Sequence, residues 1–307
     1  MKKNYFPAVK PIVLQLREFL YNADKRALAF VSFLAGTLIF LNYFFGIDSY
    51  ITNQPDILVR ITLRYLLHLV AFGVPYLFYI FPEKNRGNKN QLILLIFVAP
   101  LIFALKMSFR WPSFSKWDIF WEQVVYWPVL LIMVVAILFA CSKLFRSPAL
   151  FLRVPKTLNP WPYFYMLLIM VPLIAFAAFQ QQFQEVYPKL FKIEAPSTVN
   201  VPSWLRIIVF EIAYGSDFIT IELFFRGFLI LGFIKWAGKY AILPMAVFYC
   251  VIHFGKPPLE CISSYFGGII LGVIVYHSRS VIGGLIVHLG IAWMMEVAGY
   301  VAYVLKK

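Results

Sequence analysis

Nine long apolar runs, separated by short basic segments, constrain the fold of this chain more than any other feature. They cover residues 27–47, 58–81, 91–105, 124–145, 163–179, 204–234, 241–253, 262–276 and 281–305. A helix of about 20 apolar residues spans the hydrocarbon core of a bilayer and satisfies its own backbone hydrogen bonds there. Because the runs lack the strict alternation of barrel strands, they predict an all-α fold, a polytopic transmembrane bundle of about eight or nine helices. The run 241–253 is short for a full span, so we expect this helix to end partway through the bilayer.

The composition agrees with a membrane-embedded chain. Only 14% of the 307 residues are charged and 62% are hydrophobic, which leaves too few polar side chains to cover a water-soluble domain. The net charge of +14 comes from Lys and Arg gathered between the apolar runs, where they would contact anionic lipid headgroups rather than nucleic acid. The N-terminal segment and every second loop are richest in these residues, which predicts that they face the cytoplasm. We therefore expect an integral, multi-pass protein of a bacterial-type cytoplasmic membrane, with lipid as a partner and no nucleic acid.

Ionisable residues inside the apolar runs gather in the last third of the chain. Such groups are costly in hydrocarbon, and each is therefore a hypothesis about function. The set is Glu211, Asp217, Glu222, Arg226, His253, Glu260, His288 and Glu296. Glu222 and Arg226 are four residues apart, which places both on one helix face within reach of a charge-assisted hydrogen bond. The pair is equally compatible with a self-neutralising contact that only fixes helix packing.

Two histidines lie beside backbone rich in glycine or proline. His253 ends the short apolar run and is followed by Phe-Gly-Lys-Pro-Pro-Leu and then Glu260, a sequence that breaks a helix. Irregular backbone at membrane depth is tolerated where it is buried in protein or lines a cavity. His288 lies in Gly-Gly-Leu-Ile-Val-His-Leu-Gly, and Gly268 and Gly272 form a small-xxx-small pair on the preceding run. These segments predict a polar site within tightly packed helices.

The order of these residues resembles a known family. A Glu-x-x-x-Arg-Gly motif, a helix ending in His, a glycine-rich helix and a helix with an internal His are similar to the CAAX-protease and bacteriocin-processing (CPBP) family. Its members are also called Abi proteins or type II CAAX prenyl endopeptidases. The resemblance covers roughly residues 204–300 and implies a multi-helix intramembrane endopeptidase. It divides the chain into N-terminal membrane spans of unassigned role, residues 1–200, and CPBP-like catalytic-core helices, residues 201–307.

The resemblance also implies roles for individual residues. In the family, a Glu of the Glu-Glu-x-x-x-Arg motif and the His of the next motif activate water, and a later His with an Asn four residues on stabilises the oxyanion. By position, His253 is similar to the water-activating His and His288 to the oxyanion His. Glu222 and Arg226 match the second Glu and the Arg of the first motif.

Two positions of the chain depart from the family pattern. Ile221 stands at the first Glu of the motif and cannot polarise water, and Ala292 stands at the Asn and cannot donate to an oxyanion. The aromatic residue expected four positions before the second-motif His is present as Tyr249.

These residues support two main hypotheses. The first is an intramembrane endopeptidase acting on a peptide or membrane-protein substrate, with Glu222 or Glu260 as base, His253 orienting water, His288 polarising the carbonyl and Arg226 supporting a carboxylate. A variant adds a divalent metal such as zinc, held by His253, His288 and Glu260, since three protein ligands plus water are typical of catalytic zinc. The second is a catalytically inactive pseudo-protease that acts as a membrane binding or scaffold protein, which the two departures favour. A transporter is the weaker third reading, because no inverted repeat is present.

Overall fold

A computed structural model describes residues 11–77, 89–110, 119–145, 159–192 and 202–306, and within these ranges the secondary structure is helical, as predicted. The α-helices are α1 (Ile12–Tyr21), α2 (Lys25–Phe45), α3 (Ile47–Thr52), α4 (Ile57–Gly73), α6 (Lys89–Ser108), α7 (Ile119–Leu144), α8 (Trp161–Ala178), α9 (Gln181–Val186), α10 (Ser203–Glu222), α11 (Ile234–Ala237), α12 (Ile242–Val251), α13 (Pro258–Ser278) and α14 (Ile282–Leu305). Short 3₁₀ helices are η1 (Val74–Tyr76), η3 (Lys189–Lys192) and η5 (Gly238–Ala241), and η4 (Leu223–Gly232) is a π-helix.

The membrane-spanning character of the bundle follows from helix length and hydropathy. Among the described residues, seven helices are long and apolar enough to cross a bilayer, namely α2, α4 with η1, α6, α7, α8, α13 and α14. The run 204–234 forms α10 and continues into η4. The short run 241–253 forms α12, which has only 10 residues, so its prediction as a short helix is confirmed. The basic loop residues at 2–10, 84–86, 116 and 146–156 lie outside the described ranges.

The ends of the first two spans are set by local sequence. Asp24 precedes α2 and its carboxylate accepts hydrogen bonds from the backbone N–H groups of the first turn, and Asp56 does the same for α4. Both satisfy donors that a helix N-terminus otherwise leaves unpaired. Gly46 ends α2 with a φ of 67°, a left-handed conformation that glycine adopts without steric cost. The chain then turns directly into α3.

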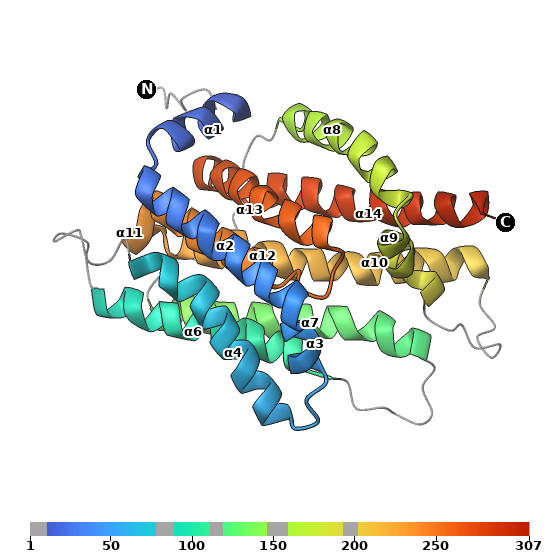
Figure 1. Ribbon diagram of the computed structural model, residues 1–307, viewed down its shortest axis with the longest axis horizontal. Coiled ribbons are helices and arrows are strands. Elements are labelled where there is room, and N and C mark those ends of the chain that lie inside the picture. Colours follow the sequence, from blue (N-terminus) through green and yellow to red (C-terminus); the bar gives the residue numbers. More distant parts are fainter. Residues whose placement is uncertain (1–10, 78–88, 111–118, 146–158, 193–201, 307) are drawn as a thin grey trace, which may run out of the picture.

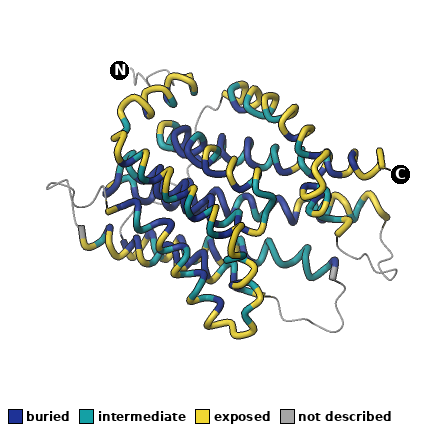
Figure 2. The backbone as a smooth tube through the Cα atoms, in the orientation of Figure 1, coloured by how far each residue is buried: buried dark blue, intermediate teal, exposed yellow. Residues whose placement is uncertain are grey.

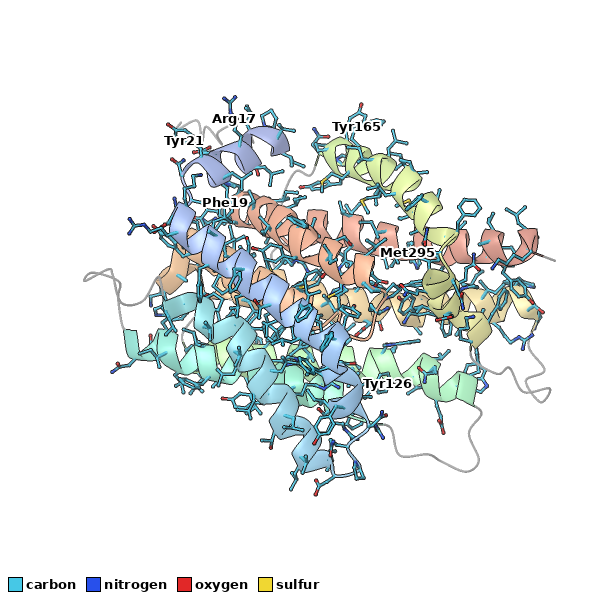
Figure 3. The ribbon with its side chains drawn as sticks, viewed as in Figure 1. Arg17, Phe19, Tyr21, Tyr126, Tyr165 and Met295 are labelled. Atoms are coloured by element: carbon cyan, nitrogen blue, oxygen red, sulfur yellow. The ribbon has the colours of Figure 1, made fainter. Side chains whose placement is uncertain are left out.

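Helix α12 lies at the centre of the bundle, between α13, α4 and α2 (Figure 1). All ten residues of α12 and all ten of η4 are buried, whereas much of α8 is exposed (Figure 2). Phenylalanine rings join the central elements: Phe103 of α6 contacts Phe225 of η4, which contacts Phe248 of α12. One continuous core thus combines helices from before and after residue 200. Outward-facing aromatic side chains such as Tyr165 on α8 (Figure 3) are placed to meet lipid.

Glycines allow α13 to approach α12 closely. A Cβ built on Gly268 would lie 3.3 Å from the Cα of Ala246, and one built on Gly272 would lie 2.9 Å from the Cε of Met245. These distances are shorter than ordinary contacts. A larger residue at 268 would press on the backbone of α12, and one at 272 would displace the end of the Met245 side chain. The small-xxx-small pair therefore does what its pattern indicates, and it fixes α13 against the helix that leads to His253.

Candidate active site

Glu222 and Arg226 form an ion pair at the junction of α10 and η4. Nη1 of Arg226 lies 3.0 Å from Oε1 of Glu222, and both side chains are almost completely inaccessible to solvent. The i,i+4 spacing brings them together even though the helix changes from α to π geometry immediately after Glu222. Nε and Nη2 of Arg226 have no hydrogen-bond partner among the described residues. Two buried opposite charges stabilise one another here, and removal of either would leave the other uncompensated.

The same carboxylate also binds His288 of α14. Nδ1 of His288 lies 2.9 Å from Oε1 of Glu222. An ionised carboxylate only accepts hydrogen bonds, so Nδ1 of His288 carries a proton and donates it. Oε2 of Glu222 points at Gly284 of α14, where an added Cβ would lie only 2.6 Å away. Gly284 thus leaves the room that lets a carboxylate from α10 reach α14.

Tyr249 of α12 connects the two histidines. Its hydroxyl oxygen lies 3.0 Å from Nε2 of His288, and its ring centroid lies 4.6 Å from that of His253. The guanidinium carbon of Arg226 lies 4.0 Å from the centroid of the same ring, which is a cation–π contact. Phe218 of α10 packs edge-on against the ring of His288 at 4.8 Å. The site therefore draws side chains from α10, η4, α12 and α14.

His253 lies in the turn between α12 and α13. Its Nδ1 is 2.8 Å from the carbonyl oxygen of Tyr249. A carbonyl can only accept, so Nδ1 carries the proton and Nε2 keeps its lone pair. Nε2 of His253 has no hydrogen-bond partner among the described residues. This neutral tautomer can accept a proton from water.

The N-terminal helices hold the turn that follows His253. The hydroxyl of Tyr43 on α2 donates to the backbone carbonyl of Lys256 at 2.7 Å. Gly255 has a φ of 71°, and an added Cβ would lie 2.8 Å from Oδ2 of Asp48 on α3. Asp48 is in turn paired with Arg64 of α4 at 3.2 Å. The first spans, whose role the sequence leaves unassigned, therefore contribute to the position of His253.

Glu260 belongs to a neighbouring polar cluster. Its two carboxylate oxygens accept from the hydroxyl of Tyr187 at 3.2 and 3.3 Å, and Nζ of Lys256 lies 3.6 Å from Oε1. Burial disfavours the charge on Lys256, but Tyr187 and Glu260 outweigh it and hold the pKa of Lys256 above its usual range. Burial raises the pKa of Tyr187 and lowers that of the nearby Lys189 to about 8. Within the described ranges, Glu260 makes no hydrogen bond or ion pair with His253 or His288.

The other ionisable residues of the last third have separate environments. Asp217 pairs with Lys106 of α6 at 2.6 Å, and Oε2 of Glu296 accepts from the backbone N–H of Lys189 at 2.8 Å. Oε2 of Glu211 is buried without a hydrogen-bond partner in the described part of the chain. The structure thus brings together Glu222, Arg226 and His288 directly, and His253 through Tyr249, but not Glu260 or these three carboxylates.

The donors proposed for a metal do not converge in this arrangement. Across the described residues, no group of three or more His, Cys, Asp or Glu side chains is placed to hold a metal ion. Nδ1 of His253 is used by a backbone carbonyl, Nδ1 of His288 by Glu222, and Glu260 by Tyr187 and Lys256. The side chains as placed in the described part of the chain do not fit a zinc site.

Tyr249 and Phe218 are parts of the site that the sequence did not single out as functional. The useful signal for Tyr249 was its spacing, because a residue four before His253 on the same helix shares its face. Phe218 is likewise four before Glu222, but one more Phe among the 32 of this chain carries no signal of its own. Contact between these residues and His288 depends on how three helices pack.

A comparison with protein families matches the segment of the chain that contains this site. Residues 201–294 match the family model described as type II CAAX prenyl endopeptidase Rce1-like, which confirms the resemblance inferred from the motifs. No curated protein and no solved structure matches the chain. The matched segment contains Glu222, Arg226, Tyr249, His253 and His288. Together with the apolar helices, it marks an integral, multi-pass membrane protein similar to CAAX proteases.

Proposed function

We propose, from the match of residues 201–294 to the type II CAAX prenyl endopeptidase family, that this protein is an intramembrane endopeptidase. One observation carries the proposal: a buried Glu222–His288 hydrogen bond of 2.9 Å lies within a helical bundle, next to a second histidine that has a free acceptor nitrogen. Buried ionisable groups in a membrane are costly, and a histidine tautomer with an open lone pair is what general-base catalysis needs. The substrate is a peptide or membrane protein, and a bacterial-type cytoplasmic membrane is the proposed location.

The proposed reaction is hydrolysis of a peptide bond. Nε2 of His253 accepts a proton from water while the water oxygen attacks the carbonyl carbon. His288, oriented by Glu222 and hydrogen-bonded to the hydroxyl of Tyr249, stabilises through this hydrogen-bonded pair the negative charge that develops on the carbonyl oxygen. Arg226 balances the charge of Glu222 and keeps this carboxylate in place. Collapse of the tetrahedral intermediate breaks the C–N bond, and the amine leaves with the proton that His253 took from water.

This assignment changes the residue that acts as the general base. Glu222 or Glu260 was expected to act as the base, but Glu222 contacts Arg226 and His288, and Glu260 contacts Tyr187 and Lys256. We therefore propose His253 as the base and Glu222 as the residue that orients His288. Glu260 is proposed to support the turn around Lys256.

A specific observation also favours the scaffold alternative. Ile221 and Ala292, at the positions of the family's first Glu and its Asn, are both largely buried and apolar, so neither contributes a polar group to the site. His253 contacts no carboxylate in the described part of the chain. A pseudo-protease would keep the Glu222–His288 bond for packing and bind substrate segments without cleaving them.

Proteolysis in liposomes distinguishes these functions. Purified wild type, His253→Ala and Glu222→Gln would be compared on quenched fluorescent peptides, both soluble and lipidated, with His277→Ala as a matched control at the exposed end of α13. Loss of a general base lowers kcat by about 10²–10⁴-fold, which is the result we expect for His253→Ala, whereas His277→Ala stays near wild type.

Two further arms complete the experiment. Glu260→Ala keeps activity within about tenfold if Glu260 only supports the turn, and a chelator tests the metal-dependent variant directly. Folded wild-type protein that cleaves none of the substrates would contradict the peptidase and favour the scaffold.

A further inference from the structure

Three side chains of the site form a hydrogen-bonded relay. Oε1 of Glu222 lies 2.9 Å from Nδ1 of His288, and Nε2 of the same ring lies 3.0 Å from the hydroxyl oxygen of Tyr249. The three residues come from α10, α14 and α12. A carboxylate, an imidazole bonded through both nitrogens and a hydroxyl in this order are the elements of a catalytic triad, which is recognised by geometry rather than by chain order.

The position of Tyr249 is tightly fixed. Its side chain is buried, with the guanidinium of Arg226 over one face and the ring of His253 against its edge. An added Cβ on Gly268 would lie 3.2 Å from Cδ1 of Tyr249, so the glycine leaves just enough room for the ring. A hydroxyl held this firmly needs little reorganisation when it donates to a developing charge.

The hydroxyl of Tyr249 has one proton, and in the neutral ring, with Nδ1 of His288 donating to Glu222, Nε2 accepts that proton. A tyrosine hydroxyl has one donor and also accepts. When Nε2 of His288 is protonated, it donates to the tyrosine oxygen, and the hydroxyl proton is directed away from the imidazole. Glu222, on the other side of the ring, accepts the hydrogen bond from Nδ1 of His288 in either protonation state of the ring.

We propose that Tyr249 is a catalytic residue whose hydroxyl donates a hydrogen bond to the carbonyl oxygen of the scissile peptide. The proposal rests on the peptidase function proposed above and adds to it a donor that neither the family match nor the sequence assigns. Ala292, four residues after His288, is apolar and packs with Phe210 and Tyr214 in a hydrophobic cluster, so it offers no donor there. Tyr249 supplies the missing hydrogen bond from α12 instead.

The test is removal of the hydroxyl with the ring retained. Tyr249→Phe is compared with Tyr265→Phe, a matched control in α13 whose buried side chain also loses one hydroxyl hydrogen bond, to Ser32 at 2.9 Å. Loss of one oxyanion donor lowers kcat by about 10²–10³-fold, so we expect that loss for Tyr249→Phe, with KM within about threefold. Tyr265→Phe retains wild-type kcat.

A second measurement separates catalysis from structure. Incorporation of 3-fluorotyrosine at position 249 keeps the shape of the ring but makes the hydroxyl a stronger acid, so kcat changes and its pH profile shifts, which a purely structural hydroxyl would not cause. Wild-type kcat in both Tyr249→Phe and the fluorinated protein overturns the role of Tyr249 and leaves the peptidase standing. Absence of cleavage by folded wild type overturns both proposals together.

Discussion

Replacement of Gly284 by alanine tests the contact between α14 and Glu222. The added Cβ would lie 2.6 Å from Oε2 of Glu222, while Cδ of Glu222 and Cγ2 of Val275 are both at an ordinary 3.5 Å. The carboxylate must therefore move by almost 1 Å. Its other oxygen is held by Arg226 at 3.0 Å and His288 at 2.9 Å, so the movement weakens both interactions.

The magnitude follows from these opposing effects. Overpacking costs about 1–3 kcal/mol, and weakening a charge-assisted hydrogen bond adds about 1 kcal/mol. The gain in helix propensity from glycine to alanine offsets about 1 kcal/mol. We expect a net loss of about 2 kcal/mol for Gly284→Ala. Gly267→Ala in α13, whose Cβ would have no heavy atom within 4 Å, should gain up to about 1 kcal/mol.

Unfolding of the two glycine variants in mixed detergent micelles with increasing SDS measures this difference. The free energies of unfolding of Gly284→Ala and Gly267→Ala should differ by about 3 kcal/mol. Gly284→Ala should also lower peptidase activity, because it displaces the carboxylate that orients His288, and Gly267→Ala should not. If both variants unfold at the same SDS fraction and retain the same activity, Glu222 does not lie against Gly284 and the site geometry described above is wrong.

Three further predictions address other contacts. Glu222→Gln leaves Arg226 buried without a counter-charge and should destabilise the protein by about 3–5 kcal/mol, and adding Arg226→Met should restore much of it in SDS unfolding. Tyr43→Phe removes the donor to the carbonyl of Lys256 and should cost about 1 kcal/mol, with faster hydrogen exchange confined to residues 252–256; unchanged exchange there would contradict the anchor. Burial lowers the pKa of Lys189 to about 8 from an ordinary 10.5, so the unfolded chain binds more protons between these values and stability should rise with pH there. A Lys189→Met variant should lose that rise, and an unchanged slope would contradict the lowered pKa of Lys189.

The sequence alone was sufficient to predict the helices, because each apolar run can be recognised from its own residues. A stretch such as 281–305 needs no partner to be recognised as a span, since its length and apolar character are local properties, and the structure places α14 at 282–305. The short α12 and the break after His253 were also predictable from neighbouring residues alone. The length of the apolar run indicates the first, and the Gly-Lys-Pro-Pro sequence indicates the second. The pairing of Glu222 with Arg226 followed from helix periodicity.

The relations between helices were decided by tertiary structure. The sequence placed Glu222, His253, Glu260 and His288 in one pocket, but it could not tell which carboxylate meets which histidine. That outcome depends on helix rotation and on close approach at Gly284, which lets Glu222 reach His288, while Tyr187 from a distant segment reaches Glu260. The anchoring of the His253 turn by Tyr43 spans 213 residues of sequence, and no local pattern encodes a contact of that separation.

The sequence by itself therefore determined that this chain is a membrane-embedded helical bundle with a family-like set of ionisable residues in its last third, because hydrophobicity, helix period and motif order are properties of neighbouring residues. Only the tertiary structure decided that Tyr249 stands between the two histidines and that Glu260 stands apart from them. The physical reason is that side-chain chemistry depends on distances of about 3 Å between helices, and these are fixed by packing rather than by any one segment.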